Sequence, residues 1–210
     1  MKIINISTWD RKDTFEFYKS LDHPMYQMTF NLDVTHFYEV IKENNRSFYF
    51  SFMYLAMKEM NKIDAFKYRF HQNDVVLYDR IHPSFTDNIE GTERFKIVTV
   101  DYQDDWVSFV EHAKQVSFAQ GELFIDLSKE ERDDLVYVTT FPWASFTQVT
   151  FAHNHNSKDA IPRLTWGKFE TVNQRKIMAL GIGVHHAFVD GLHVGQFINR
   201  LQEALNQIKT

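Results

Sequence analysis

Two hydrophobic patterns meet near the C-terminal end of the chain. Apolar residues occupy every second position from Met178 to Val184, which is the period of a β-strand. Apolar residues then recur at helical spacing, at Val194, Phe197, Ile198, Leu201, Leu205 and Ile208. The intervening residues read HHAFVDG, so we expect a strand, a tight turn and a helix. Because adjacent residues of a strand point to opposite faces, at most one of His185 and His186 takes part in chemistry.

The same two periods divide the rest of the chain into short elements. Helices are expected over residues 33–44, 47–61 and 105–120, with one helical turn in the charged stretch 122–134. Strands are expected over residues 2–6, 25–32, 66–70, 75–78, 85–89, 94–101, 135–140 and 145–151. His71–Asp74 separates two of these strands and indicates a hairpin. The helix over 47–61 is apolar nearly all round, which predicts burial against a sheet.

Length and composition narrow the fold class and the kinds of partner. With 210 residues, 44% of them hydrophobic, the chain is expected to form one domain over residues 1–210, of the α+β class. A net charge of −5 and the lack of any run of Lys or Arg argue against binding to nucleic acid. Cysteine is absent, which excludes disulfides, thiolate catalysis and cysteine-ligated metals. No segment has the length of a signal peptide core or a membrane span, so we expect a cytoplasmic protein.

One histidine pair raises the question of a metal. His153 and His155 are one residue apart in an expected loop. Zinc normally takes three or four protein ligands, and the chain contains neither cysteine nor an HExxH motif. We therefore expect a solvated loop there and no metal site.

Several stretches together resemble the chloramphenicol acetyltransferase family. HHAFVDGLHVGQF, from His185 onward, is similar to the family signature HHxxxDG and the amphipathic helix that follows it. Trp9, Arg11 and the FEFY sequence match the N-terminal pattern of the family, and Pro142–Phe146 matches its PWxSF segment. The spacing from Trp143 through Thr165 to His186 fits without a gap. The resemblance extends from about Trp9 to Gln207.

The resemblance implies a role for each matched residue. His186 corresponds to the general base, and Asp190 to a carboxylate that pairs with Arg11. Thr139, four residues before Trp143, takes the place of a serine whose hydroxyl stabilises the oxyanion, and Thr165 corresponds to a threonine that holds a water. The residues alone leave other interpretations open: a hydrogen-bonded core histidine, an N-cap aspartate, a surface arginine and a strand threonine chosen for packing.

The acceptor pocket matches the family less closely. Phe17, Tyr18 and Phe95 keep the aromatic walls that the resemblance implies. Met25, Ser84, Ile97 and Tyr137 stand where the family has Cys, Gln, Ala and Asn. The larger side chains among these would narrow or reshape a pocket for a nitrophenyl propanediol.

The resemblance also implies an architecture and a reaction. The fold would be a two-layer α/β sandwich with a mixed sheet and helices on one face. Three copies would form a homotrimer with active sites between subunits. The reaction would be direct transfer of an acetyl group from acetyl-CoA to a hydroxyl of chloramphenicol, without an acyl-enzyme. Two alternatives are an acyltransferase for another hydroxylated acceptor and a non-catalytic trimeric binding protein.

Overall fold

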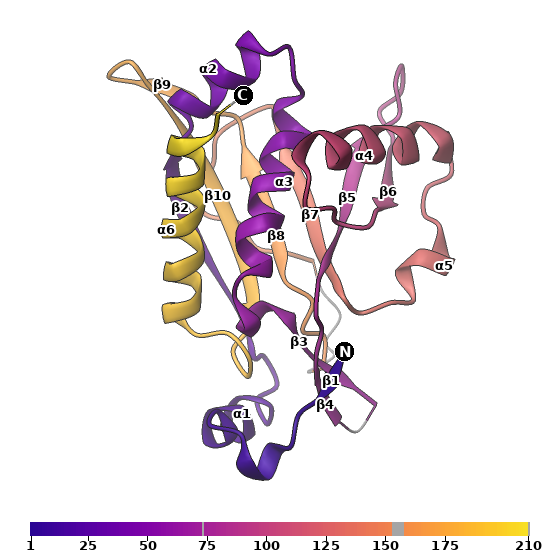
Figure 1. The fold of residues 1–210 in the computed structure, drawn as a ribbon, viewed down its shortest axis with the longest axis vertical. Helices are drawn as coiled ribbons and strands as arrows, with labels where there is room; N and C mark the ends of the chain where they lie inside the picture. The colour runs from indigo at the N-terminus through magenta and orange to yellow at the C-terminus, as the bar shows by residue number, and fades with distance from the viewer. Residues whose placement is uncertain (73, 153–157, 210) are drawn as a thin grey trace.

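The centre of the protein is a mixed β-sheet. The computed structural model describes residues 1–72, 74–152 and 158–209. The strands follow the order β2–β10–β8–β7–β5–β6, and the short β9 pairs with β10 (Figure 1). Their bounds are β2 Met25–Asp33, β5 His82–Asn88, β6 Phe95–Thr99, β7 Leu135–Phe141, β8 Arg163–Gly167, β9 Glu170–Val172 and β10 Arg175–His185. Strand β7 runs parallel to β5 and β8, whereas β10 is antiparallel to β2 and β8, which makes the sheet mixed.

A second, three-stranded sheet lies near the N-terminus. It contains β1 (Lys2–Ile3), β4 (Asp74–Leu77) and β3 (Tyr68–His71), in that order. His71 pairs with Asp74 in the antiparallel register of β3 and β4, so the predicted hairpin is confirmed. The strand expected over residues 2–6 is shorter than predicted, because the chain enters a 3₁₀ turn at Ile6–Thr8.

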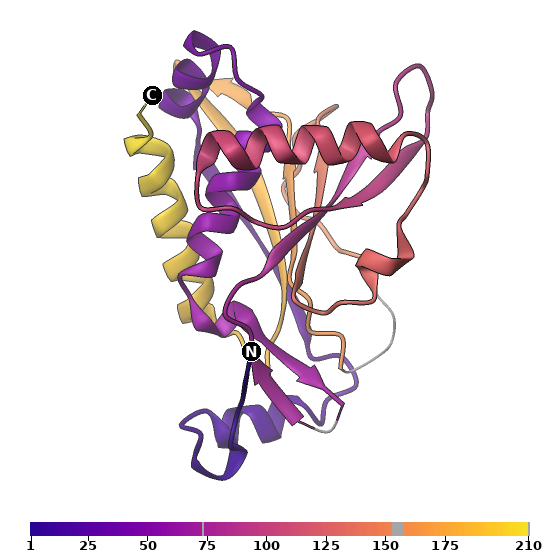
Figure 2. The same cartoon turned by 45° about the vertical axis from the view of Figure 1, so that its right-hand side comes forward.

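The longest helices lie on one face of the main sheet. Figures 1 and 2 show α3, α4 and α6 together on that face. The bounds are α1 Lys12–Tyr18, α2 Thr35–Glu43, α3 Phe48–Asn61, α4 Trp106–Gln120, α5 Leu127–Glu130 and α6 Gly191–Gln207, with a 3₁₀ turn at Asp64–Lys67. Helix α5 is the helical turn expected in the charged stretch. The two-layer arrangement predicted from the sequence is confirmed.

Helix α3 forms the middle of the hydrophobic core. Ser47 caps its first turn by accepting a hydrogen bond from the Phe50 amide at 3.4 Å. Phe52, Met53 and Met57 are fully buried, because α3 packs against the sheet and lies beside both α4 and α6. A helix enclosed on several sides needs an apolar surface nearly all round, which is the pattern that predicted its burial.

Strand β10 presents different side chains to the two sides of the sheet. Its even-numbered residues, Met178 to Val184, belong to the core beneath the helices. On the opposite face, a Cβ built on Gly181 would lie 2.2 Å from Val149 Cγ1, and one on Gly183 would lie 2.8 Å from Phe151 Cδ2. These glycines therefore allow the segment 145–151 to approach the strand closely.

That segment corrects one prediction. Residues 145–151 form no strand; Phe146, Val149 and Phe151 instead pack over the glycines of the sheet. The parallel neighbour of β7 is instead β8, with Thr139 paired to Thr165. Strand β8 was not predicted, although Leu164 and Trp166 alternate with Arg163 and Thr165, because the pattern covers only five residues.

A membrane-spanning helix and a metal-binding cluster are both absent from the residues that the structure describes. Among residues 1–72, 74–152 and 158–209, no helix is long and apolar enough to cross a membrane. In the same residues no group of three or more His, Cys, Asp or Glu side chains is arranged to hold a metal ion. The His153 and His155 pair lies outside the described residues.

We expect Gly181→Ala to destabilise the fold, because its Cβ would overlap Val149. Overpacking of this kind costs about 1 to 3 kcal/mol. The matched control is Gly195→Ala in α6, where an added Cβ meets nothing within 4 Å. Alanine in a helix interior is favoured over glycine, so the control should be neutral or up to about 1 kcal/mol more stable. Urea unfolding of both variants measures the difference; equal effects would contradict the close approach.

Candidate active site

His186 lies in the turn that follows β10. Its amide donates to the Pro24 carbonyl at 2.9 Å, which extends the pairing of β10 with β2 by one residue. The imidazole stacks on the Tyr18 ring, with centroids 3.7 Å apart and planes at 3°, and the Tyr26 ring lies 4.7 Å away. Its side chain is 29% exposed. The imidazole is therefore held by aromatic rings while part of it stays accessible.

Asp190 lies beside one nitrogen of this imidazole. The distance from His186 Nδ1 to Asp190 Oδ1 is 3.2 Å. The contact is electrostatic, because Nδ1 is buried and makes no well-aligned hydrogen bond with the described residues. A carboxylate next to Nδ1 favours the tautomer with its proton on that nitrogen. We assign the proton to Nδ1 on this basis, which leaves Nε2 as the free base.

Arg11 joins the turn to the N-terminal part of the chain. Its Nε donates to the Ala187 carbonyl at 2.8 Å, and its Nη2 donates to the His186 carbonyl at 3.0 Å. Both terminal nitrogens also bind the Asp190 carboxylate, Nη2 at 2.6 Å from Oδ1 and Nη1 through Oδ2. The hydrogen bond from Arg11 holds the pKa of Asp190 below its usual range. The predicted ion pair between Arg11 and Asp190, which lie far apart in the sequence, is therefore present.

His185 has a different environment. It is 1% exposed and packs edge-on against Phe70, with ring centroids 5.2 Å apart. Its Nδ1 accepts a hydrogen bond from the Ala187 amide at 3.1 Å. The two adjacent histidines therefore point into separate surroundings, as the strand pattern predicted.

A second group of predicted residues lies in the middle of the sheet. Thr139 on β7 and Thr165 on β8 are parallel register partners, and Thr165 is 3% exposed. The hydroxyls of Thr139 and Thr86, which belongs to β5, are 3.1 Å apart. Thr165 is also paired with Gly181, so these threonines share the sheet face that lies opposite the helices.

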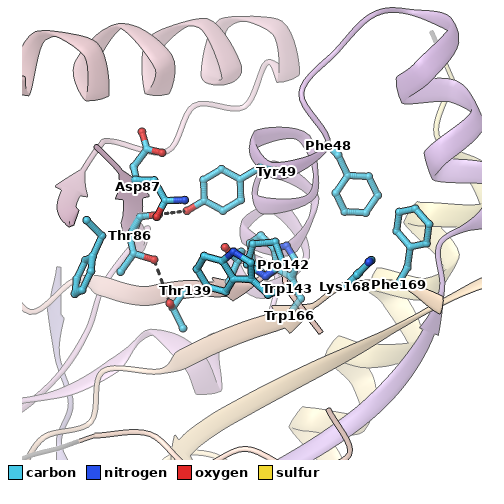
Figure 3. Close-up of a pocket in the computed structure, with 14 residues that line it drawn as sticks. Phe48, Tyr49, Thr86, Asp87, Thr139, Pro142, Trp143, Trp166, Lys168 and Phe169 are labelled. Atoms are coloured by element: carbon cyan, nitrogen blue, oxygen red, sulfur yellow. Dashed lines mark hydrogen bonds between the residues drawn. The ribbon is translucent and has the colours of Figure 1, made fainter. Parts of the chain in front are cut away.

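Two cavities adjoin Thr139. The first has a volume of about 730 Å³ and is lined by the rings of Tyr49, Trp143 and Phe169, among others, and by Lys168 (Figure 3). The second has a volume of about 660 Å³ and is lined in part by Ser84, Ile97, Glu130, Tyr137 and Arg163. Thr86 and Thr139 line both cavities. The Thr139 hydroxyl therefore lies at the junction of two spaces that can hold separate ligands.

Comparisons with known proteins agree with this geometry. The family model described as chloramphenicol acetyltransferase matches residues 1–202. A chloramphenicol acetyltransferase from a Klebsiella species is 34% identical over 202 residues, covering 95% of this chain and 91% of its own length. One from Escherichia coli is 32% identical over 200 residues, with the same coverage.

The chain belongs to the chloramphenicol acetyltransferase family. A solved structure of a chloramphenicol acetyltransferase superposes with a TM-score of 0.91 at 26% identity, covering 97% of this chain and 99% of that one. The protein is therefore an enzyme of an acetyl-CoA-dependent transferase family.

The other predicted site residues are distributed between the two groups. Met25 begins β2 and pairs with His185, next to the turn that carries His186. Phe17 is 62% exposed and lies edge-on to Tyr18, with centroids 5.0 Å apart. Phe95 lines the first cavity, whereas Tyr137 lines the second. The aromatic walls expected around one pocket are thus divided between separate places in a single copy of this acetyltransferase chain.

Some residues of the site were not found from the sequence. Thr86 and Tyr49 are joined by a hydrogen bond of 2.7 Å from the Tyr49 hydroxyl to the Thr86 carbonyl (Figure 3). Glu130 projects into the second cavity from α5. Neither Thr86 nor Tyr49 belongs to a motif, and Glu130 is hidden in the charged run SKEERDD. Only the tertiary structure shows which of these side chains reaches a cavity.

The two groups are separated within one subunit. His186 is five residues beyond Gly181, the register partner of Thr165. Five residues of a strand span roughly 16 Å, and Thr139 lies one strand farther away again, about 5 Å. His186 is not among the described residues that line either cavity. The general base and the oxyanion donor expected of this family therefore do not meet within one chain.

We expect Arg11→Ala to destabilise the fold by about 1 to 3 kcal/mol at neutral pH. Losing one member of a buried pair costs more, but the Asp190 side chain is 33% exposed and water screens part of the interaction. The control is Arg94→Ala, whose pair with Glu122 is 61% and 69% exposed and should contribute less than about 1 kcal/mol. Urea unfolding measures both variants. Equal losses would contradict the role of Arg11 in the turn.

The effect of Arg11 should also depend on pH. Because the pKa of folded Asp190 lies below the ordinary value of 3.8, the ion pair contributes fully above that pH. The contribution disappears as the pH falls through the lowered pKa and the carboxylate is protonated. The stability difference between wild type and Arg11→Ala should therefore shrink as the pH falls below 3.8. A difference that grows in acid would contradict the assignment.

Proposed function

We propose that this enzyme transfers the acetyl group of acetyl-CoA directly to a hydroxyl of chloramphenicol, with His186 as general base. The observation that carries the proposal is the position of the Thr139 hydroxyl between two cavities, one for each substrate. The orientation of His186, with Nδ1 beside Asp190 and Nε2 free, supports its part in the reaction. Acetylation of the antibiotic would make the protein a resistance enzyme, and the expected location is the cytoplasm.

The reaction follows from these groups. Nε2 of His186 takes the proton of the acceptor hydroxyl as its oxygen attacks the thioester carbonyl carbon. The carbonyl oxygen becomes negative in the tetrahedral intermediate, and the Thr139 hydroxyl donates a hydrogen bond to it. The intermediate then collapses, the carbon–sulfur bond breaks, and the imidazolium returns its proton to the departing thiolate of CoA. Asp190 stabilises the imidazolium, and Arg11 fixes Asp190.

The first cavity suits the thioester substrate. Aromatic rings from Phe48, Trp143 and Phe169 provide apolar and stacking surfaces, and Lys168 provides a cation (Figure 3). CoA combines a pantetheine arm, an adenine ring and phosphates, so rings beside a lysine match its chemistry. We propose that acetyl-CoA binds here with its carbonyl oxygen directed at Thr139. The second cavity, with Ile97 and Tyr137, then receives the acceptor.

We propose that the complete site lies between subunits of a homotrimer. His186 of one copy would reach the junction at Thr139 of the next copy. The separation of roughly 20 Å within one chain supports this arrangement, because proton transfer needs contact distances. In a cyclic assembly each interface joins two different surfaces, so a trimer would contain three equivalent sites.

A different hydroxylated acceptor is the second candidate. The second cavity contains the carboxylate of Glu130 and the large side chains of Ile97 and Tyr137. Such a lining differs from the apolar pocket that a neutral nitrophenyl compound prefers. The reaction and the donor would be unchanged.

We expect His186→Ala to lower kcat by about 10² to 10⁴, because the general base is lost. The measurement is thiol release from acetyl-CoA in the presence of chloramphenicol. His185→Ala should mainly lower the unfolding temperature, since that side chain is buried against Phe70. Turnover close to wild type in a folded His186→Ala enzyme would contradict the general-base role.

We expect Thr139→Ala to lower kcat by about 10² to 10³, whereas Thr139→Ser keeps the hydroxyl and most of the activity. Thr140→Ala is the control, because adjacent strand residues point to opposite faces. Steady-state rates at saturating acetyl-CoA separate the three variants. A larger loss in Thr140→Ala than in Thr139→Ala would shift the oxyanion assignment by one residue.

A further inference from the structure

The second cavity contains a carboxylate with a fixed position. Oε1 of Glu130 accepts a hydrogen bond from the Ser84 hydroxyl at 2.9 Å and another from the Thr99 hydroxyl. Ser84 and Thr99 are 2% and 5% exposed, on strands β5 and β6. Two buried hydroxyls thus hold Glu130 above the sheet, at the wall of the cavity.

Among the residues that the structure describes, no unpaired cation of the cavity lining balances the negative charge of Glu130. The other charged residues of the lining are Asp159 and Arg163, which pair with each other at 2.5 Å. Oε2 of Glu130 makes no hydrogen bond or ion pair with the residues that the structure describes. The described lining therefore has two carboxylates and one guanidinium, and the excess charge belongs to Glu130.

Tyr137 lies near this charge and adds an aromatic surface. Burial in the cavity wall, and next the carboxylate of Glu130, raise the pKa of the Tyr137 phenol. The phenol consequently stays neutral at physiological pH. The Arg163 guanidinium already lies over that ring, 5.6 Å from its centroid. The carboxylate of Glu130 is therefore the group that attracts an ammonium.

We propose that Glu130 determines acceptor specificity, and that the preferred acceptor is a hydroxylated compound that also has a protonated amine. The ammonium would donate to Oε2 of Glu130 while the hydroxyl reaches the junction at Thr139. A neutral acceptor would instead remove water from the carboxylate without replacing its hydrogen bonds, which weakens binding. This inference rests on the proposed acetyl transfer.

A purely structural role for Glu130 gives a different expectation. In that case the carboxylate serves only to accept from the Ser84 and Thr99 hydroxyls. Glu130→Gln separates the two roles, because the amide oxygen still accepts these hydrogen bonds while the charge is removed. Glu131→Gln is a matched control, since Glu131 is exposed, is the next residue in the chain and does not line the cavity.

The test compares two acceptors that share the same carbon scaffold. One is chloramphenicol, which is neutral, and the other is the primary amine obtained by removing its dichloroacetyl group, which is protonated at pH 7. Thiol release gives kcat/KM for each acceptor, and mass spectrometry of the product locates the acetyl group on oxygen. Wild type should prefer the amine. Glu130→Gln should lower kcat/KM for the amine by about tenfold to a hundredfold, the range of one lost charge-assisted hydrogen bond.

The outcomes separate this inference from the proposed function. Glu130→Gln should raise kcat/KM for chloramphenicol, because the neutral acceptor no longer desolvates a charge, and Glu131→Gln should leave both values unchanged. If both acceptors are turned over and Glu130→Gln does not change the ratio of their kcat/KM values, the specificity role of Glu130 is overturned. The proposed acetyl transfer then still stands. A folded wild-type protein that transfers acetyl to neither compound would overturn the proposed function, and this inference with it.

Discussion

The turn that carries His186 depends on one guanidinium group. Arg11 donates to the carbonyls of His186 and Ala187 and binds both oxygens of Asp190, so a single side chain fixes the backbone and the carboxylate of the turn. The planar, five-donor geometry of arginine permits this set of contacts, which lysine cannot reproduce. The position of Asp190, 3.2 Å from Nδ1 of His186, in turn favours a proton on that nitrogen. An ion pair beside the imidazole therefore orients the proposed base.

The sheet positions Thr139, the proposed oxyanion donor. Parallel pairing of β7 with β8 and of β7 with β5 brings Thr139 beside Thr165 and Thr86, on the face without helices. Glycines at 181 and 183 allow a loop segment to pack against that face close to the second cavity, which Phe151 also lines. The strand order thus creates a junction between two cavities, and in the proposed reaction one subunit would supply the oxyanion donor without its base.

The sequence alone predicts the parts that depend on local pattern or on a motif. The strand–turn–helix around His186 follows from two hydrophobic periods, and the family motif identified Arg11 as the partner of Asp190, which the structure confirms. Strand β8 was not predicted, because its alternating pattern covers only five residues. Residues 145–151 were predicted as a strand and are not one, since their apolar side chains pack over the glycines of the sheet without strand pairing. Glu130 gave no signal, because only the fold distinguishes it from its charged neighbours.

The shared site is tested most directly with mixed trimers. Subunits carrying His186→Ala and subunits carrying Thr139→Ala are each inactive in pure form, and equal amounts are unfolded together and refolded. If each site combines His186 of one copy with Thr139 of the next, about a quarter of the interfaces in a random mixture contain both intact residues. A site shared in this way should therefore recover about a quarter of the wild-type rate of thiol release. A mixture that stays as inactive as the two parent variants would contradict it.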